Sequence, residues 1–187
     1  MGAAEKLNEP APGLVLNALF ANPALMAMFT QAIVDTLHGF TQVQVQPGQA
    51  RRETSAPKGQ KFFGAATIRL EGLPTGIELM LAFDRESFEV IYGQIFQTPS
   101  DIPGDAASLA GEILNVAFGA IREKLAEKGY KSRYSLPCCY YGQELERFVA
   151  ACDPQRIVLP FVYENRSFAI EIFAGGSLQS AWKFSPS

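Results

Sequence analysis

The sequence predicts an α+β fold in which long helices pack against a mostly antiparallel sheet. Apolar residues recur at helical spacing over residues 105–128, which indicates one long helix. Short apolar runs stand in pairs, 61–70 with 77–83 and 156–164 with 167–173, and a short turn separates the members of each pair. Strands joined in this way pair antiparallel. The predicted order of elements is α-β-β-β-α-α-β-β-β, with helices and strands in blocks.

The first part of the chain predicts a helix, a strand and a loop. An Asn-Pro pair at its start indicates a helix over residues 23–38, which Gly39 is expected to end. Residues 41–46 alternate between polar and apolar side chains, the pattern of a half-buried strand. Residues 46–60 are rich in Pro, Gly, Arg and Lys, so we expect a turn or a flexible hairpin there.

The middle of the chain predicts two helices after the first strand pair. A turn at 71–76 joins these strands, and Asp84 is placed to cap a helix over 85–96. A proline-containing loop at 98–104 leads into the long helix, and Gly129 is expected to end it.

The last part of the chain predicts strands and a loop. Residues 130–139 resemble a strand that is broken by Pro137, as expected at a sheet edge or bulge. Residues 140–153 are polar and compatible with a helix, and we expect a loop. Asn165 suits the left-handed turn of the closing hairpin.

The chain of 187 residues is long enough for one domain with a core, since 48% of its residues are hydrophobic. We expect a polar N-terminal tail with a short helix over 1–22, a domain over 23–176 and a C-terminal tail over 177–187.

Composition and missing motifs exclude many functions. A net charge of −3 gives no electrostatic reason to bind nucleic acid or an anionic membrane. No apolar run is long enough to span a bilayer, and the N-terminus does not resemble a secretion signal, so a cytoplasmic protein with free thiols is expected. His38 is the single histidine, which rules out a multi-histidine metal site. No nucleophile elbow, P-loop or dinucleotide-binding motif occurs, so we expect neither a metal site nor a cofactor of its own.

The long helix carries an unusual polar face over residues 108–122. Glu112 and Asn115 are three residues apart and therefore lie side by side on it. A helical wheel places Val116 on the apolar side. Small residues surround the pair, although a glycine inside a helix costs about 1 kcal/mol relative to alanine. We expect another protein to approach this face closely, at Ser108, Gly111 and Gly119.

Several segments together resemble the CheX branch of the CheC/CheX/FliY phosphatase family of bacterial chemotaxis. They are V-Q-V-Q-P-G after the first helix, the strand pair within 63–83, and the closing hairpin. The helix face supplies the signature Ser108-x-x-x-Glu112-x-x-Asn115, which Pro137 follows after 21 intervening residues. The resemblance implies a CheC/CheX-like fold.

The resemblance also implies a function. Members hydrolyse the aspartyl-phosphate of a CheY-like response-regulator receiver domain, which supplies the phosphoaspartate, a lysine and Mg²⁺ itself. Asn115 would then hold the attacking water, and Glu112 would pair with the receiver's lysine. Ser108, Gly111, Gly119 and Pro137 would contact the receiver.

Two alternatives stay open at this stage. The protein could be a non-catalytic module that binds a receiver or a motility complex, or a structural subunit related to the flagellar switch proteins. The resemblance further implies a homodimer joined through strands. We expect strands 157–163 and 168–173 to form it, because long apolar strands at the end of a chain would otherwise leave an exposed edge.

Overall fold

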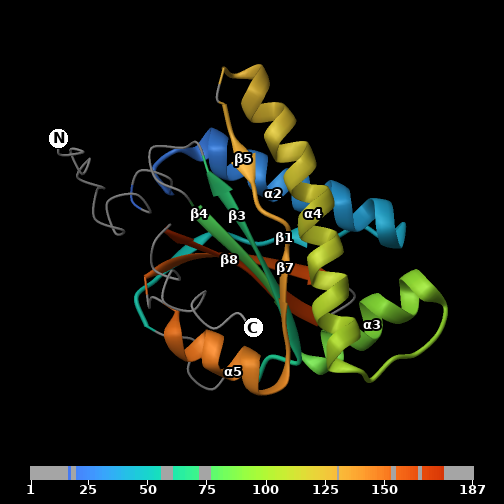
Figure 1. Cartoon of the computed structure of the whole chain (residues 1–187). Coiled ribbons are helices and arrows are strands. Elements are labelled where there is room, and N and C mark those ends of the chain that lie inside the picture. The colour runs from blue at the N-terminus through green and yellow to red at the C-terminus, as the bar shows by residue number, and fades with distance from the viewer. Residues whose placement is uncertain are drawn as a thin grey trace.

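The computed structural model describes residues 17, 20–55, 61–71, 77–129, 131–152, 155–163 and 166–174. The helices α2, α3, α4 and α5 span Pro23–Thr41, Arg85–Phe96, Pro103–Glu127 and Gly142–Ala151. The strands β1 to β8 span Gln46–Pro47, Arg51–Glu53, Gly64–Glu71, Ile77–Phe83, Arg133–Tyr134, Cys138–Tyr140, Arg156–Tyr163 and Arg166–Ala174. Figure 1 shows their arrangement.

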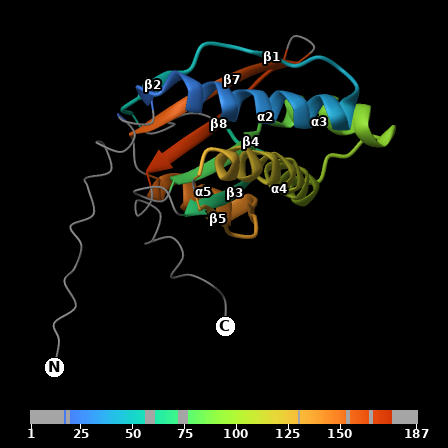
Figure 2. The same ribbon diagram turned by 90° about the horizontal axis from the view of Figure 1, so that it is seen from above.

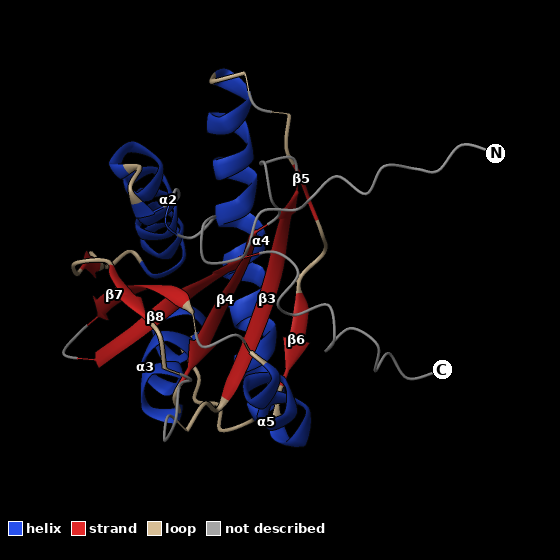
Figure 3. Cartoon of the chain, turned by 90° about the vertical axis from the view of Figure 1, so that its left-hand side faces the viewer, coloured by secondary structure: helices blue, strands red, loops and turns tan. Residues whose placement is uncertain are grey.

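The described strands form one eight-stranded sheet in which every pairing is antiparallel. Its order is β1-β7-β8-β4-β3-β5, with β2 also paired to β7 and β6 also paired to β3. The predicted α+β class with an antiparallel sheet is therefore confirmed. Figure 3 shows α4 behind β3 and β4, along the direction of these strands.

The two faces of the sheet carry different helices. One face packs against α2, α3 and α4 in the main core, around fully buried side chains such as Phe29, Phe88 and Phe118. The other face packs against α5 through Leu145 and Phe148. In Figure 2, α2 and α4 lie next to each other on the main face. The outward face of α4 is therefore left for other contacts.

The position of α4 is fixed by a close approach at Gly64 in β3. A Cβ atom there would lie 2.7 Å from the Cβ of Ala106, the backbone nitrogen of Ala107 and the backbone oxygen of Pro103. Only glycine lets the strand come this near to a helix backbone. The first turn of α4 is thus seated directly on the sheet.

Most of the predicted elements are confirmed. Helix α3 has the predicted bounds, and the Asp84 carboxylate accepts a hydrogen bond from the Ser87 N–H at 2.7 Å. Helix α4 starts slightly earlier than predicted, and Gly129 follows its end with a left-handed φ of 84°. Strands β3, β4, β7 and β8 lie where the alternating and apolar runs placed them. The predicted turns at 71–76 and Asn165 lie outside the described residues, apart from residue 71.

The predicted end of the first helix is wrong. Helix α2 continues through Gly39 to Thr41, and Gln42 takes the left-handed position instead, with a φ of 59°. Phe40 continues the apolar side of the helix onto the core, which favours the extra turn. The strand predicted over 41–46 is therefore wrong except at Gln46, which belongs to the two-residue β1.

Two predicted loops contain regular structure. The segment expected to be a turn or a flexible hairpin at 46–60 holds β2, which pairs with β7 as β1 does, so β1 and β2 do not form a hairpin with each other. The segment expected to be a loop at 140–153 holds α5. Its few apolar residues recur at helical spacing and cover the second face of the sheet: Leu145, Phe148, Val149 and Cys152.

The closing strands are not sheet edges, contrary to the prediction. Strand β8 lies between β7 and β4, while β7 is covered by β1 and β2 on its other side. The edges among the described residues are short strands, and β2 carries Arg51 and Arg52, charges that disfavour pairing with another edge. The predicted tails 1–22 and 177–187 lie largely outside the described residues, so these domain bounds stay predictions. No described helix is both long and apolar enough to cross a bilayer.

Candidate functional site

The outward face of α4 carries the predicted carboxylate and carboxamide. Glu112 is exposed and Asn115 is half-buried, while the neighbouring Ser108 is exposed. The side chains of Glu112 and Asn115 are three residues apart and share this face. Within the described part of the chain, neither makes a hydrogen bond or an ion pair. The pair is therefore available to a group from outside.

Gly111 is not on this open face, contrary to the prediction. It is buried, and a Cβ atom there would lie 3.1 Å from the Cys139 Sγ, 3.5 Å from the Pro137 Cβ and 3.8 Å from the Ala66 Cβ. The glycine lets β6 and the preceding proline lie close to the helix. The expected contact of Gly111 with a partner is thus replaced by a contact within the chain, while half-buried Pro137 borders the site.

Gly119 and Val116 differ from Gly111 in their surroundings. A Cβ atom at Gly119 would meet nothing within 4 Å, so packing inside the chain gives no reason for a glycine there. Val116 was predicted on the apolar side, yet 48% of its surface is exposed. The elements that cover α4 stop short of this side of the helix, so an apolar side chain stands beside Glu112.

The segment between β5 and β6 runs alongside α4. The Ser135 N–H donates to the Arg69 carbonyl at 3.0 Å, and the Ser135 hydroxyl accepts from the Arg69 N–H at 3.1 Å and donates to the Leu136 carbonyl at 2.9 Å. The Arg122 guanidinium lies over the Tyr134 ring, 5.5 Å from its centre. The Ser135 contacts hold the segment on β3, and the Arg122 contact joins it to the helix. The Leu136 side chain is left 83% exposed.

The three cysteines are free thiols. Burial raises the pKa of Cys139, and the nearby Glu112 carboxylate raises it further. Burial is also the main reason that the pKa of Cys138 is raised. Adjacent residues in a strand point to opposite faces, so the two thiols do not act together. A raised pKa keeps both protonated at neutral pH, which makes them poor nucleophiles.

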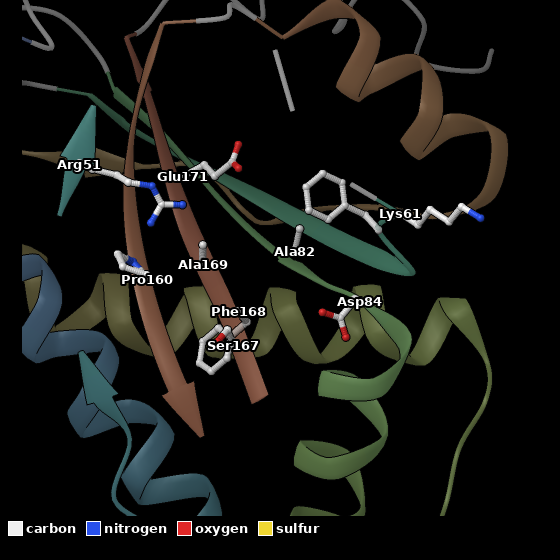
Figure 4. Close-up of a pocket in the computed structure, with 10 residues that line it drawn as sticks. Arg51, Lys61, Ala82, Asp84, Pro160, Ser167, Phe168, Ala169 and Glu171 are labelled. Atoms are coloured by element: carbon white, nitrogen blue, oxygen red, sulfur yellow. The ribbon is translucent and has the colours of Figure 1, made fainter. Parts of the chain in front are cut away.

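Away from α4 the described residues form a charged pocket but no cluster of metal ligands. The described residues contain no group of three or more His, Cys, Asp or Glu side chains that could hold a metal ion. A pocket of about 440 Å³ is lined by Arg51, Lys61, Asp84 and Glu171 among others, and no residue of α4 lines it. Figure 4 shows Arg51 and Glu171 toward one end and Lys61 and Asp84 toward the other. Arg51 and Glu171 have ion-pair partners and Asp84 caps α3, so three of the four charges are already used within the chain.

Solved structures show what the fold is similar to. No protein-family model and no curated protein sequence matches the chain. A CheC-like superfamily protein from Shewanella sp. PV-4 matches with a TM-score of 0.67 and 20% identity, over 83% of this chain and 99% of that one. The chemotaxis protein CheX from Vibrio vulnificus matches with a TM-score of 0.62 and 18% identity, over 79% and 96%. A chain of the CheX–CheY–BeF3–Mg²⁺ complex from Borrelia burgdorferi matches with a TM-score of 0.63 and 16% identity, over 80% of this chain and 96% of that one.

The chain therefore has the fold of CheC-like and CheX chemotaxis proteins, as the resemblance implied. At 16–20% identity the similarity concerns the fold. Activity depends on the residues at the site rather than on the fold.

Proposed function

We propose that this protein is a CheX-like phosphatase that hydrolyses the aspartyl-phosphate of a CheY-like receiver domain in chemotaxis or motility signalling, in the cytoplasm. The observation that carries the proposal is the pair of exposed Glu112 and half-buried Asn115 on one face of α4, without hydrogen-bond or ion-pair partners among the described residues. The fold is that of a CheX found in complex with CheY, BeF3 and Mg²⁺ in Borrelia burgdorferi, which supports a receiver as the partner.

Hydrolysis of an aspartyl-phosphate needs a water in line with the bond that breaks and neutralised charge on the phosphoryl oxygens. The receiver is expected to supply the lysine and the Mg²⁺ that neutralise this charge. The Asn115 carboxamide can accept and donate hydrogen bonds at once, so it can orient a water without being titrated. The Glu112 carboxylate, nearly one turn away, can pair with the lysine and set the docking position.

The decay of a phosphorylated receiver tests the proposal directly. Each CheY-like receiver of the source genome is phosphorylated with a small-molecule donor, and its decay is followed with and without this protein. A decay accelerated by catalytic amounts of the protein supports a phosphatase. Binding without acceleration would instead identify a non-catalytic receiver-binding module.

Glu112→Lys is expected to weaken receiver binding more than Glu112→Ala. The lysine would face the receiver's own lysine, and like charges across an interface cost more than a missing partner. Titration of both variants against a phosphorylated receiver measures the difference. Glu146→Lys is the matched control, because Glu146 is exposed on α5 at the opposite face of the sheet. Equal affinities for the two Glu112 variants would remove this carboxylate from the contact.

A homodimer stays a proposal that rests on the resemblance alone, because β7 and β8 lie inside the sheet. We expect twice the chain mass in light scattering at micromolar concentration. A monomeric mass would exclude the dimer and leave the receiver proposal unaffected, since the face of α4 that carries Glu112 belongs to one chain.

A further inference from the structure

Large apolar side chains that are exposed concentrate along α4. Six of them occur among the described residues, and four lie near this helix: one on it, one on the segment between β5 and β6, and two next to its start. Ile102 and Tyr141 lie at its start, where each comes within about 4 Å of a Cβ built at Gly104. The other two are Val116 and Leu136. Scattered exposed apolar residues are ordinary, but a group along one face indicates a contact surface.

The contacts on either side of Leu136 place it beside Asn115. Pro137, the next residue, faces Gly111, while Tyr134 packs against Phe118 with ring centres 6.2 Å apart. Leu136 lies between these two positions, level with the turn of α4 that carries Asn115.

Val116 borders the polar pair on the opposite side. The wheel that puts Gly111 toward β6 puts Asn115 next to it, Glu112 in the middle, and Val116 beyond Glu112. The carboxylate and the carboxamide therefore stand between two exposed apolar side chains, Val116 at 48% and Leu136 at 83% exposure.

The interior of the protein gives no reason for a leucine at 136. Hydrogen bonds of the Ser135 N–H and hydroxyl hold this segment on β3, and the residue before a proline adopts an extended backbone whatever its side chain. A polar residue would serve there as well. Among the described residues, packing therefore does not account for the leucine, and an apolar contact with a partner would.

We propose that Leu136 and Val116 are the apolar contacts that seat a phosphorylated receiver domain on Glu112 and Asn115, an inference that rests on the proposed function. The occupant follows from continuity, because these side chains border the face on which the receiver is proposed to act. Apolar contacts around an ion pair exclude water, which strengthens the attraction between Glu112 and the receiver's lysine. The water that remains at the site is then the one that the Asn115 amide contacts.

The test separates binding from turnover. Leu136→Ala and Val116→Ala are each expected to raise the KM for the phosphorylated receiver about tenfold with kcat nearly unchanged. Both side chains are exposed, so the substitutions leave the core intact. Val162→Ala is the matched control, because Val162 is 41% exposed in β7, and it should keep the wild-type KM.

A second readout needs no activity. Cys139 is exposed and close to Glu112, so a bound receiver should slow its alkylation. Because its pKa is raised, the reaction is run with excess maleimide at alkaline pH and followed by mass spectrometry. The protection should appear at higher receiver concentration in the Leu136→Ala and Val116→Ala proteins.

Each outcome decides between the two proposals. Wild-type KM and protection in both variants, with an active wild-type protein, would overturn the apolar contacts and leave the phosphatase standing. Weakened protection together with an inactive wild-type protein would support the contacts and overturn the phosphatase. Absence of binding to any receiver would overturn both.

Discussion

Replacing Asn115 by alanine is expected to slow receiver dephosphorylation by about 10²-fold or more, because the group that orients the attacking water is lost. The fold should be unaffected, since the side chain is half-buried on the outer face of α4 and alanine is the better helix former. Single-turnover decay of a phosphorylated receiver with excess protein measures the rate, and thermal unfolding checks the fold.

Asn115→Asp is the matched variant. It keeps the size of the side chain, but a carboxylate cannot donate a hydrogen bond and repels the phosphoryl oxygens. We expect it to be at least as inactive as the alanine variant. Both variants should still bind the receiver through Glu112, Val116 and Leu136. A wild-type decay rate in the alanine variant would show that the catalytic assignment is wrong.

The sequence predicts those parts of the fold that local signals determine. Asp84 predicts the start of α3, because a capping carboxylate acts on a residue only three positions away. The two strand pairs are predicted by the short turns between apolar runs. The helix end predicted at Gly39 is wrong because it also rests on a local signal alone. The local preference of this glycine to end a helix is outweighed by the packing of Phe40 on the core, which lies outside any local pattern.

The site is predicted less completely than the fold. A helical wheel finds the outer face of α4, but it cannot tell how far a neighbouring element reaches around the helix. The β6 strand covers Gly111, and no described element covers Val116. The wheel therefore predicts the wrong exposure for both residues at the borders of the polar face. Leu136 is missed altogether, because an apolar residue before a proline in a strand-like segment is typical of a core position.

Replacing Glu171 by alanine is expected to lower the free energy of unfolding by about 3–5 kcal/mol, the usual cost of leaving a buried charge without its partner. The Glu171 Oε2 lies 3.0 Å from the Arg156 Nε, and these side chains are only 4% and 5% exposed. Burial raises the pKa of Glu171, while Arg156 acts in the opposite direction and favours the charged form. Chemical denaturation of the wild-type and Glu171→Ala proteins measures the loss of unfolding free energy.

Glu89→Ala is the control for this prediction. Its ion pair with Arg85 is exposed, with a distance of 3.7 Å, so removal should cost less than about 1 kcal/mol. Glu171 lies on the face of the sheet opposite α4, because its neighbours Ile170 and Ile172 belong to the main core. The folded fraction of the Glu171→Ala protein should therefore dephosphorylate the receiver at the wild-type rate. A lower rate per folded molecule would mean that the far face of the sheet affects the site, whereas a stability loss below 1 kcal/mol would contradict the buried pair.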